Sequence, residues 1–270
     1  MLKDITIGQY FPGESCVHRL DPRTKILLTI GFIVALFLPK NPWGLLLGVL
    51  FAVTGYALSG VPIKLGLKSL KPIIPVVIFT AILNIAFTKG DVLWHWGIIS
   101  VTRQGIMLAV MMIVRILTLI IGSSLLTYTT SPIQLTDAIE SLLSPLKRLH
   151  MPVHELAMMM TIALRFIPLL IEETNKIISA QKARGADMES GGVIDRAKAL
   201  IPVLVPLFVS SFRRADELAL AMECRCYHGG EGRTRMKQLA YARRDAVAFL
   251  LMLLLCAAVI ALNFVIPAAY

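Results

Sequence analysis

Two arginines in similar surroundings are the residues of this sequence best suited to a specific contact. Arg184 stands in Ala183-Arg184-Gly185, and Arg225 stands 41 positions later in Cys224-Arg225-Cys226. A guanidinium that projects from a helix end can form a forked pair of hydrogen bonds with a carboxylate, which lysine does not reproduce. The chemistry predicted by this pattern is therefore recognition of an acidic partner surface, without any bond making.

Each arginine follows a long segment that is apolar at its beginning and charged at its end. We interpret both segments as helices that run from an apolar environment into water. Gly185 and the Gly229-Gly230 pair provide stops, because glycine readily takes the left-handed conformation that ends many helices. A cation also suits the negative end of a helix dipole, so a purely structural role is the alternative for either arginine.

Composition predicts an integral membrane protein. Hydrophobic residues make up 56% of the chain and charged residues only 16%, whereas soluble domains have roughly a quarter of their residues charged. The net charge of +10 does not indicate nucleic-acid binding, because the basic residues flank apolar segments and do not cover a soluble face. The four cysteines are scattered, and we expect free thiols.

No pattern in the sequence predicts catalysis, a metal or a cofactor. There is no phosphate-binding glycine loop, no nucleophile beside a base and no paired acids within an apolar segment. His150 and His154 stand four apart, but Met151-Pro152 interrupts their helix and no third ligand is evident. Arg115 lies inside an apolar segment, where a structural contact to a neighbouring carbonyl or acid is favoured over a transport role.

Five apolar segments predict about five transmembrane helices. Asp21-Pro22 is a helix-start signal before the first, and the last has 17 unbroken apolar residues. Several are short of the roughly 20 residues that cross a bilayer and must include flanking polar residues. The five are Ile26–Leu38, Trp43–Leu58, Pro72–Phe87, Gly105–Leu126 and Ala246–Leu262.

The distribution of lysine and arginine predicts a cytoplasmic N-terminus. With that orientation, the short inside segments carry seven basic residues and the outside loops carry three. The chain then divides into an N-terminal arm with four transmembrane helices (1–126), a cytoplasmic region (127–245) and a C-terminal transmembrane helix (246–270).

The predicted cytoplasmic region contains two further apolar runs, Leu156–Ile171 and Ala199–Phe212. They measure 16 and 14 residues, and each continues into a charged helical tail. We interpret them as long helices lying against the membrane face. Two additional membrane spans are the alternative.

Four motifs together resemble the T component of energy-coupling factor transporters. They are Gly8–Ser15, Asp21–Lys25, Ala183-Arg184-Gly185 and the segment Gly229–Thr234. The resemblance covers essentially the whole chain and implies an all-α polytopic membrane scaffold with long cytoplasmic coupling helices. In that family the coupling helices rest on two ABC-type ATPases, and a substrate-binding S component packs beside the T component.

The resemblance also implies the functional residues. The ATPase contacts carry over to Ala183, Arg184 and Gly185, and to Cys224, Arg225 and Cys226, although the second motif has cysteines where the family has small residues. We expect a non-catalytic, multi-pass subunit of the cell membrane that couples ATP hydrolysis by its partners to vitamin or micronutrient uptake. A dedicated cobalt or nickel transporter subunit and a membrane-bound enzyme are the alternatives.

The predicted orientation can be tested by chemical labelling. Single cysteines introduced near Asn41 and Lys89 should react with an impermeant thiol reagent added outside cells, because their loops are the less basic ones. Cysteines near Lys68 and Ser190 should not react. Labelling of position 190 from outside would contradict a cytoplasmic location for residues 127–245.

Overall fold

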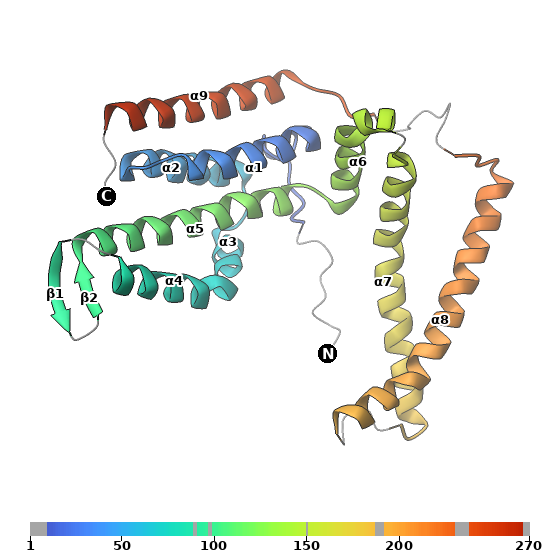
Figure 1. Cartoon of the computed structure of the whole chain (residues 1–270). Coiled ribbons are helices and arrows are strands. Elements are labelled where there is room, and N and C mark those ends of the chain that lie inside the picture. The colour runs from blue at the N-terminus through green and yellow to red at the C-terminus, as the bar shows by residue number, and fades with distance from the viewer. Residues whose placement is uncertain are drawn as a thin grey trace. The chain divides into compact units, whose positions relative to one another are not determined.

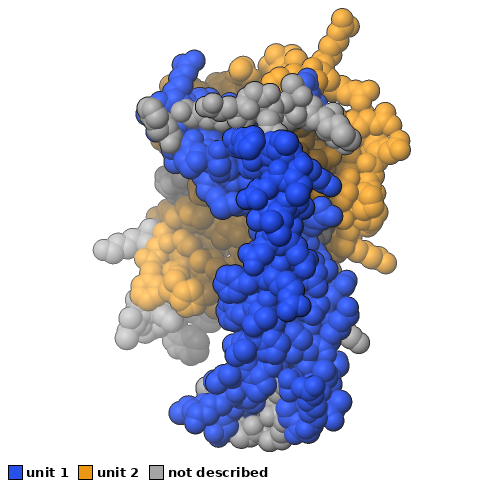
Figure 2. All heavy atoms as spheres, turned by 90° about the vertical axis from the view of Figure 1, so that its right-hand side faces the viewer, with its two compact units in different colours: residues 1–7, 139–238 blue, residues 8–138, 239–270 orange. Residues whose placement is uncertain are grey.

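The computed structural model describes residues 10–88, 91–96, 99–149, 151–186, 192–229 and 238–266. The chain forms two compact units, which are distinguished by colour in Figure 2. Residues 8–138 and 239–270 form the bundle unit, and residues 139–238 belong to the helix-pair unit. Both are built from helices, so the predicted all-α class is confirmed. The strands described are one antiparallel hairpin, β1 (Val92–Trp96) and β2 (Ile99–Thr102).

The bundle unit contains the first five α-helices and the last one. They are α1 (Pro22–Phe37), α2 (Pro42–Ser59), α3 (Ile63–Leu70), α4 (Ile74–Phe87), α5 (Arg103–Thr129) and α9 (Arg243–Val265), with the short 3₁₀ helix η1 (Lys71–Ile73) between α3 and α4. Asp21 caps α1 by accepting from the amide of Arg23, which confirms the predicted helix start. The segment 60–71, which separates the second and third predicted apolar segments, is largely the helix α3.

The core of the bundle unit lies between α1, α2, α5 and α9, which run side by side in Figure 1. Two glycines let these helices approach closely. A Cβ at Gly122 of α5 would collide with the Phe32 ring of α1, and one at Gly48 of α2 would come within 2.6 Å of Leu36. The buried core residues are Phe32, Ala35, Leu36, Leu45, Ala52, Met111, Met252, Leu255 and Val259.

The helix-pair unit is dominated by α7 (Val153–Ala183) and α8 (Val193–Cys224), which run antiparallel in Figure 1. Gln181 Nε2 donates to the carbonyl of Pro202 at 3.4 Å, and Arg214 pairs with Glu173 at 3.2 Å. The helix α6 (Pro132–Leu143) crosses the division between the units, and η2 (Ser144–Leu149) follows it. The early part of α8 is bent (Figure 1), and it contains Pro202, which removes a backbone donor.

Five of the described helical segments are long and apolar enough to cross a membrane, which confirms the predicted number. The set differs from the predicted one. α1 has 16 residues and is too short by this criterion, whereas α7 qualifies and α8 does not. By length and composition, α7 could either lie against the membrane face or cross the membrane. The same criteria do not favour a membrane span for the apolar run 199–212 of α8. The five are Pro42–Ser59, Ile63–Phe87, Arg103–Thr129, Val153–Ala183 and Arg243–Val265.

A buried polar group, which we name the anchor cluster, joins the beginnings of α1 and α9. It consists of Asp21, Arg23, Lys25 and Asp245, and all but Arg23 are less than 7% exposed. The amide of Asp21 donates to Asp245 Oδ1 at 2.9 Å, and Asp245 Oδ2 caps α9 by accepting from the amide of Ala242 at 2.8 Å. Arg23 pairs with Asp21 at 2.9 Å.

Lys25 extends the anchor cluster to the end of α5. Its Nζ donates to the carbonyl of Thr129 at 2.8 Å and to that of His18 at 3.0 Å. Burial acts to raise the pKa of the Asp21 carboxyl, but the hydrogen bonds and charge of Arg23 outweigh it and hold this pKa below its ordinary value. Asp21 is therefore ionised at neutral pH and faces two cations.

At the other end of the bundle unit, amide side chains join the turn between α1 and α2 to the end of α9. Asn41 Nδ2 donates to the carbonyl of Leu262, and Asn263 Nδ2 donates to that of Leu38. Arg115 of α5 donates to the carbonyl of Pro39 at 2.9 Å, which confirms the expected structural contact of this arginine. Polar contacts thus fix both ends of the apolar core.

We expect Asp245→Ala to destabilise the bundle unit strongly. The change leaves the buried amide of Asp21 without its acceptor, which costs about 1 to 3 kcal/mol, and it also removes the cap that Asp245 gives to the amide of Ala242. The thermal midpoint of the purified chain should fall by about 5 to 10 °C. Glu14→Ala is the control, because its exposed pair with Arg19 contributes less than about 1 kcal/mol. Equal shifts for both variants would contradict the role of the anchor cluster.

Candidate functional site

The helix α7 ends in a left-handed stop directly after Arg184. Arg184 is the cap residue, with φ −86° and ψ 6°, and Gly185 takes a φ of +85°. The amide of Ala186 then donates to the carbonyl of Gln181, and that of Gly185 to Lys182, both at 3.0 Å. This pair of bonds is a Schellman motif, which satisfies carbonyls that the end of the helix would otherwise leave unpaired.

The helix α8 ends in the same way after Arg225. Arg225 has φ −92° and ψ 14°, and Cys226 takes the left-handed conformation at φ +56°. The amide of Tyr227 donates to the backbone carbonyl of Met222 at 3.1 Å, and the amide of Cys226 donates to the backbone carbonyl of Glu223 at 2.8 Å. The expectation that the Gly229-Gly230 pair stops this helix is wrong. The Schellman motif needs a left-handed residue directly after the cap residue. On α8 this residue is Cys226, which has the position that Gly185 has on α7.

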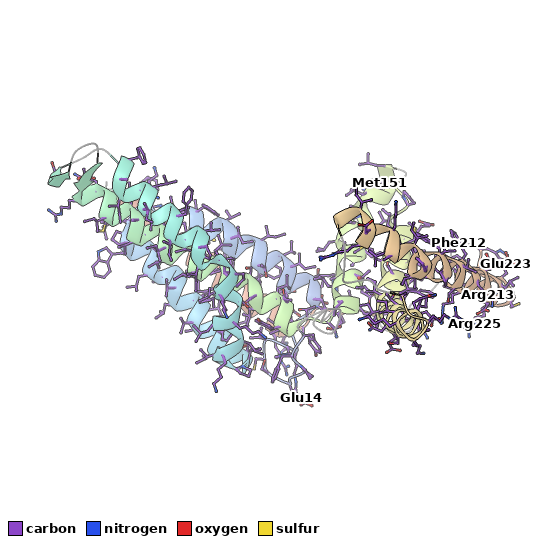
Figure 3. The ribbon with its side chains drawn as sticks, turned by 90° about the horizontal axis from the view of Figure 1, so that it is seen from below. Glu14, Met151, Phe212, Arg213, Glu223 and Arg225 are labelled. Carbon is purple, nitrogen blue, oxygen red and sulfur yellow. The ribbon has the colours of Figure 1, made fainter. Side chains whose placement is uncertain are left out.

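Both arginines are exposed and available to a partner. Within the described residues, neither the Arg184 nor the Arg225 guanidinium has an ion pair or hydrogen bond, whereas Arg214 on the same unit pairs with Glu173. Ala183, Cys224 and the two left-handed residues are exposed as well. Figure 3 labels Arg225 and Glu223, whose side chains extend from the ribbon near the end of α8.

The two arginines lie at opposite ends of the helix pair. Because α7 and α8 are antiparallel and Gln181 contacts Pro202, Arg184 lies beside the beginning of α8. About 23 residues of α8 then separate Pro202 from Arg225, which corresponds to about 35 Å at 1.5 Å per residue. The structure does not bring the two motifs together into one site. It presents two separate contact points of similar backbone geometry.

An exposed apolar stripe follows α8 between these points. Its members recur at the three- and four-residue spacing of one helix face, and Phe212, labelled in Figure 3, is 68% exposed. Such a stripe needs an apolar cover, which is either lipid or a protein partner. The residues are Ile201, Leu204, Val205, Phe208 and Phe212.

His154 has a structural partner. Its Nδ1 lies 3.1 Å from Glu140 Oε1, which connects α7 to α6. Sequence reasoning missed this pair because the two residues are 14 positions apart across η2. His150 lies outside the described residues, and within them no group of three histidine, cysteine or acidic side chains is placed to hold a metal.

Two of the four sequence motifs are described only in part. Residues 8 and 9 of the N-terminal motif and 230–234 of the last motif lie outside the described part of the chain.

The left-handed position of Cys226 leads to a paired prediction. Side chains with a Cβ pay about 1 kcal/mol or more in this conformation, so Cys226→Gly should stabilise the end of α8 and Gly185→Ala should weaken the end of α7. Hydrogen exchange measures both effects at the amides that close the two motifs. Exchange at Tyr227 should slow about fivefold, and exchange at Ala186 should accelerate about fivefold. Unchanged exchange at Tyr227 would show that Cys226 is unstrained.

Comparisons with known proteins identify the family. The family model of CbiQ, described as cobalt transport protein, matches residues 13–236. A protein of Ruminiclostridium cellulolyticum is 60% identical over 92% of both chains, and one of Acidaminococcus fermentans is 56% identical over 99% of this chain and all of the relative. A Bacillus subtilis protein is 47% identical over 95% of this chain and 97% of its own.

All three relatives bear the name energy-coupling factor transporter transmembrane protein EcfT. The family model matches four of the five long apolar helices and both arginine motifs, and the match to the Acidaminococcus fermentans protein covers 99% of the chain. The chain therefore belongs to the CbiQ family and, within it, to the transmembrane T components of energy-coupling factor transporters.

Proposed function

We propose that this T component rests on two ABC-type ATPases through Arg184 and Arg225, one at each end of the helix pair. The observation that carries the proposal is the repetition of one helix end. Each helix ends in the same Schellman motif, with an exposed arginine as its cap residue, and neither guanidinium has a partner within the described residues. The antiparallel helices hold the two arginines on the order of 35 Å apart. Two similar contacts at that separation suit two similar partners better than a single ligand.

The left-handed stop gives each arginine a defined direction. It ends the helix abruptly, so the guanidinium extends beyond the last turn, where a groove with a carboxylate can receive it. The helix dipole favours a cation at this end and keeps the arginine compatible with a stable helix when no partner is bound. ATP hydrolysis then belongs to the partners, and this chain transmits their movement.

The exposed apolar stripe of α8 supports a second partner, the substrate-binding S component. Val205, Phe208 and Phe212 are each more than half exposed, which is costly against water. A membrane protein packed on this stripe would remove that surface from water. Movement of the ATPases at the two ends of the pair would then reach the S component through α8.

The proposal includes the orientation in the membrane. Seven basic residues on the inside against three on the outside support a cytoplasmic N-terminus. In this orientation residues 127–245 would meet the ATPases on the cytoplasmic side of the cell membrane. The net transport is uptake of a vitamin or other micronutrient that the S component selects. The chain provides no residues for catalysis in this scheme.

A dedicated cobalt or nickel transporter is the second candidate, because the matching family model is described as cobalt transport protein. The names of the relatives favour the energy-coupling factor group. Purification of the complex and identification of the S component by mass distinguishes the two. Uptake of labelled cobalt that depends on this chain would support the metal transporter.

Substitution of the two arginines tests the proposed contacts. Loss of one member of a buried interfacial charge pair costs about 2 to 5 kcal/mol, much of it from the charge left unpaired. Arg184→Ala and Arg225→Ala should each reduce ATP-dependent uptake in vesicles while the chain stays folded in the membrane. The double variant should abolish uptake. Arg184→Glu should be worse than alanine, and an Asp→Arg or Glu→Arg change on the ATPase should restore part of the loss.

Arg213 provides the matched control. It is exposed on α8 like Arg225 but lies within the helix, away from the left-handed stop. Arg213→Ala should leave uptake nearly unchanged, because a solvated or headgroup-facing arginine contributes less than about 1 kcal/mol. Equal losses for Arg213→Ala and Arg184→Ala would show that general positive charge, and not a specific contact, supports the activity.

A further inference from the structure

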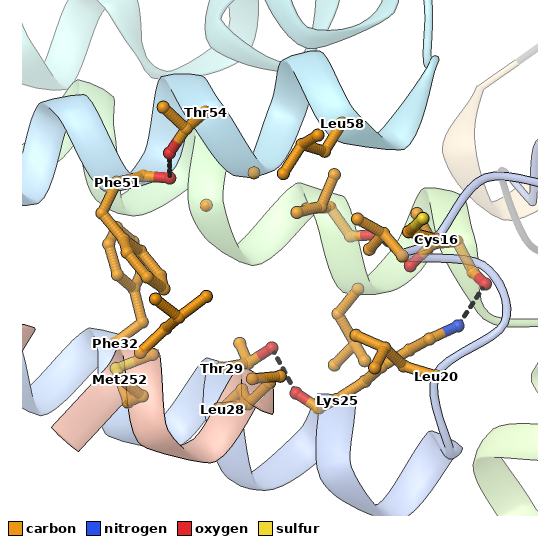
Figure 4. A pocket seen from close by; sticks show the side chains of 18 of the residues that line it. Cys16, Leu20, Lys25, Leu28, Thr29, Phe32, Phe51, Thr54, Leu58 and Met252 are labelled. Carbon is orange, nitrogen blue, oxygen red and sulfur yellow. Dashed lines mark hydrogen bonds between the residues drawn. The ribbon is translucent and has the colours of Figure 1, made fainter. Parts of the chain in front are cut away.

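The bundle unit contains a cavity of about 720 Å³ between α1, α2, α5, α9 and the loop before α1. Figure 4 shows Phe32, Phe51 and Met252 gathered at one end and Lys25, Leu20 and Cys16 at the other. Its lining includes residues between Lys25 and Phe32 on α1 and between Arg243 and Met252 on α9. Both sets begin near the start of their helix and extend along it. From Arg243 to Met252 the rise along α9 is about 14 Å at 1.5 Å per residue, so the cavity is elongated and follows the helix axes.

Most of the lining is apolar, and its hydroxyl groups are already satisfied. Thr29 Oγ1 donates to the carbonyl of Lys25, and Thr54 Oγ1 donates to that of Leu50. Small residues, among them Gly55 and Ala248, leave the space open. A void lined in this way stays dry or takes an apolar molecule, because water would lack hydrogen-bond partners there.

The charged end of the cavity has one sign. Among the described residues that line it, the charged ones are Lys25, Arg243 and Arg244, and none is acidic. Lys25 is occupied by two carbonyls, but Arg243 and Arg244 are exposed and have no ion pair within the described residues. The adjacent Asp245 is turned away to cap α9 and bind Asp21. Arg243 and Arg244 thus provide two available cations at one end of the apolar cavity.

We propose that this cavity binds an anionic glycerophospholipid, with an acyl chain between the helices and the phosphate at Arg243 and Arg244. The volume lies in the range of small-molecule sites. A helix from another protein, about 10 Å wide, would need about 1,100 Å³ for the same 14 Å and does not fit. Basic pockets between transmembrane helices suit anionic headgroups, and the positive end of the α9 dipole adds to the attraction. The lipid would fill the space that the anchor cluster borders.

Native mass spectrometry of the purified full chain tests the proposal with phosphatidylglycerol and with phosphatidylcholine of identical acyl chains. Phosphatidylglycerol should bind at least tenfold more tightly. Arg243→Gln with Arg244→Gln should remove this preference. Ala248→Phe, which keeps all charges but narrows the cavity, should weaken phosphatidylglycerol binding at least tenfold. Lys64→Gln with Lys68→Gln removes the same charge elsewhere on the bundle unit and should have no effect.

Several results would overturn the proposal. Equal affinity for the two lipids, or an equal loss in the lysine control, would show general attraction to the protein surface. Unchanged binding to Ala248→Phe would show that no acyl chain enters the cavity. Displacement of the lipid by millimolar inorganic phosphate would indicate a free phosphate site.

A second measurement uses the unsubstituted chain, so it does not depend on the folding of variants. Cys16 is exposed and lines the cavity, whereas Cys224 and Cys226 are exposed on the helix-pair unit. Phosphatidylglycerol should slow the reaction of Cys16 with a maleimide several-fold relative to phosphatidylcholine and leave the other two thiols unaffected. Equal reactivity of Cys16 in both lipids would contradict occupation of the cavity.

Discussion

The bundle unit depends on the buried anchor cluster at the beginning of α1. Asp245 accepts from two backbone amides, and Lys25 donates to two carbonyls, so one group of charges joins α1, α9 and the end of α5. Burial of each charge is costly, and the hydrogen bonds that the charge makes to the backbone or to an opposite charge offset this cost. The chain leaves the bundle unit after residue 138, shortly after Thr129, and returns at residue 239, shortly before Asp245. The cluster therefore holds together the two points through which the helix-pair unit is connected to the membrane helices.

The ends of α7 and α8 differ from the anchor cluster, because neither the Arg184 nor the Arg225 guanidinium has a partner among the residues that the structure describes. Arg184 and Arg225 stand on two helix ends that the backbone terminates in the same way, although one stop uses Gly185 and the other uses Cys226. Cys226 thus keeps, at a cost in backbone strain, the left-handed conformation that Gly185 has, which is consistent with the proposed contact of the arginine before it. A long rigid pair with a contact at each end, and an apolar stripe between them, is suited to transmit movement between partners.

Much of this could be predicted from the sequence, because the signals are local. Asp21-Pro22 marked the start of α1, and composition indicated the number of long apolar helices. The stop of α8 was misplaced because Gly229-Gly230 is the stronger glycine signal, whereas backbone hydrogen bonding selected Cys226. The contact between Asp21 and Asp245 joins residues 224 positions apart, and the cavity is lined from five segments. Neither leaves a pattern in a single stretch of sequence.

The most direct measurement is site-specific photo-crosslinking in membranes that contain the whole transporter. A photoreactive residue at position 183 or 224 stands beside Arg184 or Arg225 and leaves each arginine in place, and position 213 is the control. The account predicts that 183 and 224 each crosslink to an ATPase subunit and that 213 does not. Crosslinks from 183 or 224 only to lipid or to another membrane subunit would contradict the proposal that these two helix ends hold the ATPases.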